Sequence, residues 1–271
     1  MTAVPVRPVP APAPARPALA PLVPMVAKQT WYGLLGLWRI PAFTISGLVM
    51  PVLFFAFFGL PSVGRPLEGV DAGAYLLASY GAYAVGSLMV FNFGIGVASD
   101  RAAKLDLLYR ATPLPPLVYM AAKLVAAVVF ALFSLLLLFG FGALVGGIRL
   151  EPAAWAQIIA RLLLGAVPFA ALGFAIGYTA GANAATGVAN LIYLPLAFAS
   201  GLLVPLAAMP EPVQRVAPYL PTYHYGQLAW GAVGAPSEPL VVSALWLAGY
   251  AAVFLAIAAR GYHAEERRKF G

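Results

Sequence analysis

Residues 99–116 read SDRAAKLDLLYRATPLPP and form a charged segment in an otherwise apolar chain. Apolar runs of about twenty residues before it and about thirty after it are each long enough to cross a hydrocarbon layer of roughly 30 Å. A charged connection between two membrane spans has to lie in water. Its helix-forming residues predict a short surface helix that ends before Pro113. The mixed charge favours a docking surface over a plain solvated loop, and the charged residues are Asp100, Arg101, Lys104, Asp106 and Arg110.

The composition of the chain defines its class. Hydrophobic residues make up 62% of the 271 residues and charged residues 9%, compared with about 25% charged residues in an ordinary globular domain. The chain is therefore predicted to be an all-α integral membrane protein. It contains no Cys, which excludes disulfides, thiolate catalysis and Cys-ligated metals. The net charge of +7 does not indicate a nucleic-acid partner, because most basic residues are expected on one side of the membrane.

The order of apolar and polar stretches predicts the organisation of the chain. A disordered, Pro/Ala-rich tail over residues 1–24 is followed by an amphipathic helix over 25–39 that lies in the membrane interface. The alternative for 25–39 is that it forms the first turns of the first span. The tail over 261–271 is charged. Six membrane spans are expected over residues 42–60, 74–98, 117–147, 155–181, 184–206 and 240–259.

Several residues within this plan have expected structural roles. Lys123 lies about 9 Å into the third span at 1.5 Å per residue, so its ammonium can reach back to the headgroups. The aromatic cluster in the long connection 207–239 favours an interfacial aromatic belt over a binding surface. Small residues in the second span favour close helix packing over a substrate path. The cluster is Tyr223, His224, Tyr225 and Trp230, and the small residues are Gly81, Gly86, Gly94 and Gly96.

The distribution of Lys and Arg predicts the orientation. With six spans, eleven basic residues fall on the side of the two termini and the charged segment, and three fall on the other side. The positive-inside rule then places both termini and the charged segment in the cytoplasm of a multi-pass protein of the cell membrane.

The chain lacks several kinds of functional residue, and their absence reduces the number of possible functions. All nine acidic residues are expected outside the spans, so no carboxylate is available there to bind a driving ion. No phosphate-binding loop is present. His224 and His263 fall on opposite sides of the membrane and cannot share a metal, so we expect no metal or cofactor in this chain. The alternatives to an externally powered transporter are a membrane-embedded lipid-modifying enzyme and a secondary transporter.

Three features in this order carry a family resemblance: the amphipathic helix, the charged segment, and SGLLVPLAAMPEPVQRVAPYLPTYHYGQL after the fifth span. Together they resemble the ABC-2 type permeases, the membrane subunits of bacterial ABC exporters such as the multidrug and daunorubicin-resistance group. The resemblance covers residues 25–260 and implies the type V exporter-like fold. It identifies residues 99–116 as a coupling helix and 25–39 as a connecting helix, both resting on an ATPase subunit. The family often has Glu where Asp100 stands, which preserves the charge.

The resemblance also implies the working assembly. Two permease copies, identical or related, would pair with two ATP-binding subunits on the cytoplasmic face, and ATP and Mg would belong to those partners. The permease itself would not be an enzyme. The permease, surrounded by membrane lipids, would export a drug-like, lipid or lipid-linked compound by alternating access, along a path near the dimer interface. The fold alone does not identify the substrate.

Arg161 is the one charge expected well inside a span. It lies about 9 Å from the external interface at 1.5 Å per residue, which suits an interfacial anchor. The alternative is a contact to an anionic substrate or a lipid headgroup. If Arg161 faces the protein interior, its partner would be such an anion, a loop acid such as Glu151 or Glu211, or a backbone carbonyl at a proline-broken turn.

Overall fold

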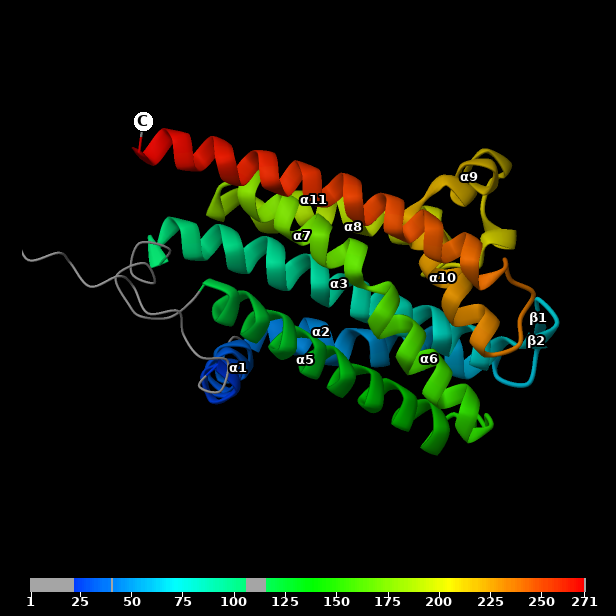
Figure 1. The fold of residues 1–271 in the computed structure, drawn as a ribbon. Helices are drawn as coiled ribbons and strands as arrows, with labels where there is room; N and C mark the ends of the chain where they lie inside the picture. The colour runs from blue at the N-terminus through cyan, green and yellow to red at the C-terminus, as the bar shows by residue number, and fades with distance from the viewer. Residues whose placement is uncertain (1–21, 40, 106–115, 271) are drawn as a thin grey trace, which may run out of the picture.

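The computed structural model describes residues 22–39, 41–105 and 116–270. Figure 1 shows a bundle of long helices that lie side by side. We call the end of the bundle at which α11 ends the tail end, and the opposite end, which carries strands β1 and β2, the hairpin end. The helices are α1 Leu22–Trp38, α2 Pro41–Phe54, α3 Ala72–Ala102, α5 Pro116–Leu144, α6 Pro152–Gly165, α7 Val167–Thr179, α8 Ala182–Ala199, α9 Glu211–Val216, α10 Pro221–Ala232 and α11 Leu240–Phe270.

Short elements join these helices. α2 continues as the π-helix η1, Phe55–Gly59, and the 3₁₀ turn η2, Leu60–Ser62. The antiparallel strands β1, Pro66–Leu67, and β2, Val70–Asp71, then lead into α3. The 3₁₀ turns η3, Leu206–Ala208, and η4, Ala217–Tyr219, flank α9.

Among the described residues, five helical stretches are long and apolar enough to cross a membrane, as the sequence indicates for spans two to six. They are Ala72–Ala102, Val118–Leu144, Pro152–Thr179, Ala182–Ala199 and Leu240–Arg267. The first expected span, 42–60, falls on α2 and η1, where the apolar stretch Gly47–Ser62 is shorter than the other five.

Some boundaries differ from the sequence-based expectation. The fourth span is two helices, α6 and α7, with Pro168 in the first turn of α7, where a missing amide hydrogen costs nothing. α8 ends at Ala199 rather than near residue 206. α11 continues through Phe270, so most of the expected charged tail prolongs this helix.

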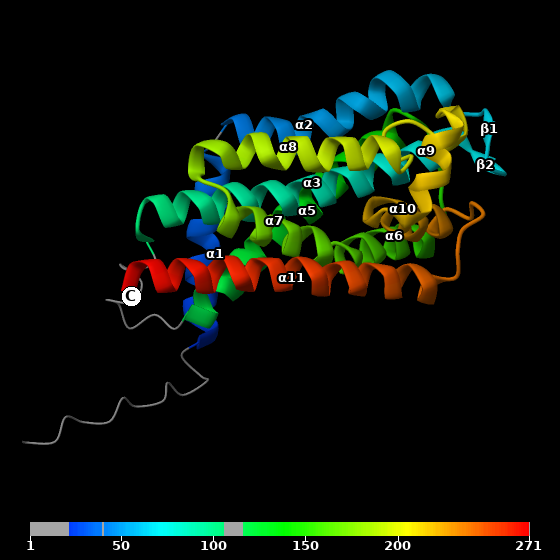
Figure 2. The ribbon, with the colours of Figure 1, turned by 90° about the horizontal axis from the view of Figure 1, so that it is seen from above.

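α1 runs across the bundle at the tail end, nearly perpendicular to the long helices (Figure 2). It begins at Leu22, three residues before the expected start. Its inner face packs on α5, where the Thr30 hydroxyl donates a hydrogen bond to the carbonyl of Ala122 at 3.4 Å. Trp31 and Trp38 are 61% and 57% exposed. Trp31 therefore points away from the bundle, whereas the Trp38 ring lies edge-on to Phe133 of α5, with centroids 6.1 Å apart.

α3 forms the centre of the bundle, because it packs against α2, α5, α7, α8 and α10 and is buried along most of its length. Its closest neighbour is α7. A Cβ at Gly173 of α7 would lie 2.8 Å from Cβ of Phe93, and one at Gly177 would lie 2.7 Å from Cβ of Val97. In lipid, where apolar burial gives no driving force, such small residues let two backbones approach and gain packing contacts. The expected packing role also holds for Gly81, which faces Phe139 and Leu162.

α10 corrects the expectation of an interfacial aromatic belt. This helix inserts into the hairpin end between α3, α6 and α11, and Tyr225, His224 and Trp230 are 0%, 1% and 3% exposed. Burial of Tyr225 and Trp230 is tolerated because their polar groups have hydrogen-bond partners, whereas Nε2 of His224 has none among the described residues. The Trp230 Nε1–H donates to Oγ of Ser79 at 2.7 Å, and the Tyr225 hydroxyl donates to the carbonyl of Leu162 at 2.6 Å.

Candidate functional site

Asp100 lies in the last turn of α3 at the tail end and fastens this helix to α5. Its carboxylate pairs with the ammonium of Lys123 and accepts a hydrogen bond from the Tyr119 hydroxyl. The Asp100 and Lys123 side chains are 28% and 20% exposed. Lys123 therefore does not simply extend to the headgroups, as the sequence suggests, but neutralises a carboxylate of the neighbouring helix.

Arg101 fastens the same turn of α3 to α7 and α11. Its Nε pairs with a carboxylate oxygen of Glu265 in α11. Its Nη1 donates to the carbonyls of Gly177 and Ala180, the latter at 3.2 Å, where α7 ends. Because the last carbonyls of a helix lack intrahelical partners and carry the negative end of its dipole, a guanidinium there satisfies both. The Tyr178 ring lies 5.9 Å from the same guanidinium.

These contacts change the interpretation of the charged segment. Asp100 and Arg101 were expected to face solvent and to be free to dock, but both are about three-quarters buried in pairs with other helices. Lys104 is exposed and adopts a positive φ of 54° just after α3 ends. Asp106 and Arg110 lie outside the described residues, and so does most of the expected surface helix. The structure thus separates two residues that join helices from one that is available on the surface.

Arg161 of α6 contacts α10 near the hairpin end. Its Nη1 donates to the carbonyl of Leu228 at 3.3 Å, and its Nη2 donates to Oε1 of Gln157 at 3.1 Å. Within the described ranges no carboxylate, including Glu151 and Glu211, lies within ion-pair distance of it. A backbone carbonyl is therefore its partner, although it belongs to a regular helix and not to a proline-broken turn.

A buried polar cluster at the hairpin end was missed by the sequence analysis. The Nδ1 atom of His224 lies 3.0 Å from a carboxylate oxygen of Glu238, and its ring stacks on Trp246 with centroids 4.9 Å apart. The Glu238 amide donates to Oε1 of Gln227 at 3.0 Å. This cluster ties the loop before α11 to α10. His263 belongs to the last turns of α11 at the tail end, whereas α10, the helix that carries His224, lies at the hairpin end (Figure 1). The described residues contain no group of three His, Asp or Glu side chains able to hold a metal.

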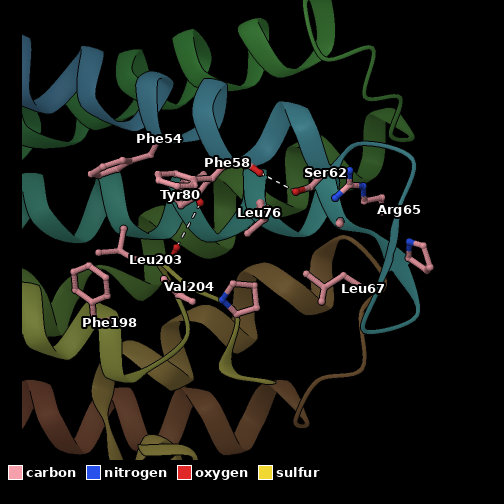
Figure 3. A pocket seen from close by; sticks show the side chains of 13 residues that line it. Phe54, Phe58, Ser62, Arg65, Leu67, Leu76, Tyr80, Phe198, Leu203 and Val204 are labelled. Atoms are coloured by element: carbon pink, nitrogen blue, oxygen red, sulfur yellow. Dashed lines mark hydrogen bonds between the residues drawn. The ribbon is translucent and has the colours of Figure 1, made fainter. Parts of the chain in front are cut away.

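A cavity of about 530 Å³ lies at the hairpin end, between the end of α2, the first turns of α3 and the turn after α8 (Figure 3). Its polar side chains are Ser62, Arg65 and Tyr80. The Tyr80 hydroxyl donates to the carbonyl of Leu203 at 3.4 Å, and the Ser62 hydroxyl donates to that of Phe58 at 2.9 Å. The apolar lining is Phe54, Phe58, Pro66, Leu67, Ala72, Leu76, Phe198, Leu203, Val204 and Pro205.

No sequence signal marked this cavity. Its lining comes from three segments, residues 54–67, 72–80 and 198–205, and the third lies more than a hundred residues from the other two. Its aromatic members look like ordinary span residues. Only the position of Arg65 immediately before the hairpin was visible in advance, as one of three basic residues on its side of the membrane. We call this cavity the apolar groove.

Comparison with known proteins assigns the family. Residues 65–260 match the family model described as "ABC-2 family transporter protein". The chain is also 31% identical over 214 residues to the "Putative transport permease YvfS" of Bacillus subtilis (strain 168), an alignment that covers 79% of this chain and 86% of that protein. The matched region contains α3 with the Asp100–Lys123 pair, Arg161 and the buried cluster on α10, and it ends before Glu265, the partner of Arg101. This chain belongs to the ABC-2 family of transporter permeases.

Proposed function

We propose that this permease is the transmembrane subunit of an ATP-driven exporter, powered by a separate ATP-binding subunit docked at the tail end. The proposal rests on one observation above all. Where the chain leaves α3, Asp100 and Arg101 tie that helix to α5, α7 and α11. A displacement applied to the segment after residue 102 would therefore act on four helices together.

The family supports the partner, since ABC-2 permeases in general work with an ABC ATP-binding subunit. The charge distribution supports the location of the partner. Among the described residues, the basic side chains of α1, of the end of α3 and of the end of α11 gather at the tail end, whereas Arg65, Arg149 and Arg215 stand at the hairpin end. By the positive-inside rule the tail end would face the cytoplasm, with both termini.

In the proposed cycle, ATP binding closes the partner subunits and moves the segment after α3. Lys104, and outside the described residues Asp106 and Arg110, would contact the ATPase, whereas Asp100 and Arg101 would pass the displacement to the neighbouring helices. α1 would lie in the membrane interface beside the same partner. Two permease copies would enclose the transport path and release the substrate on the far side. ATP and Mg would be held by the partner, and the substrate would be a drug-like, lipid or lipid-linked compound.

The decisive test is whether transport follows ATP hydrolysis by a partner. The tagged permease would be captured from its native membrane, and a co-purifying ATPase subunit would be identified by mass spectrometry. Reconstituted together, the two should show ATP hydrolysis that depends on the permease, and replacing the phosphate-binding Lys of the partner should abolish it. A permease that moves substrate without any ATPase, driven by an imposed ion gradient, would instead be a secondary transporter.

A further inference from the structure

The apolar groove has the size and lining of a ligand site. Pockets for small molecules usually enclose about 300–1,000 Å³ and combine apolar walls with a few polar groups, and this one has a volume of about 530 Å³. Two of its three polar side chains, Ser62 and Tyr80, already donate their hydroxyl hydrogens to backbone carbonyls. The walls can therefore accept a largely apolar molecule, and the only charge they offer is Arg65.

Arg65 is held in place by its backbone, while its side chain stays available. Its amide donates to the carbonyl of Ser62 at 3.1 Å, and its carbonyl accepts from the amide of Ala72 at 2.8 Å. No described carboxylate lies within ion-pair distance of its guanidinium. The nearby Asp71 carboxylate is occupied, because it accepts from the amides of Gly64 and Ala74 and caps α3.

Figure 3 shows how the charge and the apolar walls are distributed. Arg65 and Ser62 lie at one end of the groove, and Phe54 and Phe198 lie at the other. Phe58 and Phe198, which belong to different helices, are 59% and 43% exposed. The groove thus runs from a cationic end at the hairpin to an aromatic end farther along the bundle axis, toward the tail end.

We propose that the apolar groove binds an amphiphile that carries a long apolar body and an anionic headgroup. The apolar body lies against the Phe and Leu side chains, and the headgroup meets the Arg65 guanidinium. Because the proposed orientation places the hairpin end outside, the amphiphile is cargo close to its release. This last step rests on the proposed function, whereas the selectivity for an anionic amphiphile does not.

The absence of Cys from the chain allows a direct binding assay. A single Val204→Cys substitution in the groove wall provides a thiol, and its rate of alkylation by N-ethylmaleimide is measured in nanodiscs of phosphatidylcholine. The probes share a fourteen-carbon chain: myristate, myristoyl-lysophosphatidylglycerol and the zwitterionic myristoyl-lysophosphatidylcholine. The two anionic probes should protect the thiol at concentrations about fivefold lower than the zwitterionic probe, the factor that an ion pair of ~1 kcal/mol gives. Protection by only one anionic probe would distinguish a carboxylate from a phosphate headgroup.

Three further variants in the Val204→Cys background test the proposal. Arg65→Gln should remove the preference for anionic probes, and Arg149→Gln, an exposed Arg at the same end but outside the groove, should leave it unchanged. Ala72→Leu, which adds volume to the groove wall, should weaken protection by all three probes. Equal protection by charged and zwitterionic probes, or a thiol that is unreactive before any probe is added because a second copy covers the groove, would overturn the proposal.

The same materials separate this inference from the proposed function. With the partner ATPase added, an anionic probe that is cargo should stimulate ATP hydrolysis in the wild type and less so in Arg65→Gln. Protection that depends on Arg65, combined with the failure of any ATPase subunit to co-purify with the permease from its native membrane, would leave the ligand site standing and refute ATP-driven export. Loss of protection with intact ATP hydrolysis would refute the ligand site alone.

Discussion

The two ends of α3 are held by different kinds of interaction. At the tail end, the partly exposed ion pairs of Asp100 and Arg101 join α3 to α5 and α11, and hydrogen bonds from Arg101 to backbone carbonyls join it to α7. At the hairpin end, the helix is held by buried neutral groups, as in the 2.7 Å hydrogen bond between Trp230 and Ser79 and the stacking of Trp230 on Tyr75. Hydrogen bonds between neutral groups are stable in an interior without water, where an unpaired charge would cost much free energy. Partly hydrated ion pairs can exchange partners at low cost.

This difference indicates that the two ends of α3 have different roles. In the proposed cycle, the tail end changes its contacts when the partner moves the following segment, whereas the hairpin end keeps α10 in place against α3. Variants that break one end and spare the other test this division.

The first prediction assigns the two ends to the two sides of the membrane. Ser237→Cys at the hairpin end and Ala264→Cys near the end of α11 place exposed thiols at opposite ends of a chain that has no other Cys. In intact cells, an impermeant maleimide should label Ser237→Cys and leave Ala264→Cys unlabelled, and permeabilised cells should label both. Labelling of Ala264→Cys alone in intact cells would invert the topology and remove the tail end as a docking place for a cytoplasmic ATPase.

The second prediction breaks the hairpin end. Trp230→Ala removes a ring that is 3% exposed and leaves a cavity beside Ser79 and Tyr75, so it should destabilise the protein by about 3–5 kcal/mol. Thermal unfolding in detergent, followed by size-exclusion chromatography, measures the effect. The matched control is Trp31→Ala on α1, where the ring is 61% exposed and should change the stability little. Equal melting temperatures for the two variants would show that α10 is not a packed part of the bundle.

The third prediction concerns Arg161, where we expect a small effect. If Arg161 positions α10 through the carbonyl of Leu228, Arg161→Lys should behave like the wild type, and Arg161→Gln should lose about 0.5–1.5 kcal/mol of stability with little change in transport. A contact to an anionic substrate gives the opposite result, namely full stability of Arg161→Gln with loss of transport. Melting temperature and transport, measured on the same preparations, separate the two roles.

The sequence predicted the helical membrane architecture, because span length and apolar composition are imposed by the thickness of the bilayer. It also located the charged segment, since charges are excluded from the spans. It could not predict the partners of these charges. Lys123 and Glu265 lie 23 and 164 residues from the acid and base that they neutralise, and nothing local marks either pair.

The burial of α10 was hidden for a different reason. An aromatic, Pro-rich connection has the same composition whether it lies in the interface or inserts into the bundle, and the outcome depends on partners such as Ser79 and the Leu162 carbonyl on other helices. The apolar groove was equally hidden, because it exists only where three separate segments meet.

The central claim is that the tail end of α3 passes movement to its neighbours through its ion pairs. Its most direct test is a charge exchange between Asp100 and Lys123, measured as permease-stimulated ATP hydrolysis by the reconstituted complex. Asp100→Lys and Lys123→Asp each place like charges together and should each lower the stimulation about fivefold or more, equivalent to a coupling energy of ~1 kcal/mol for residues in contact. The double exchange restores an ion pair and should recover most of the stimulation. A double variant as inactive as the single ones, with the ATPase still bound, would contradict the claim and show that Asp100 acts on the partner directly.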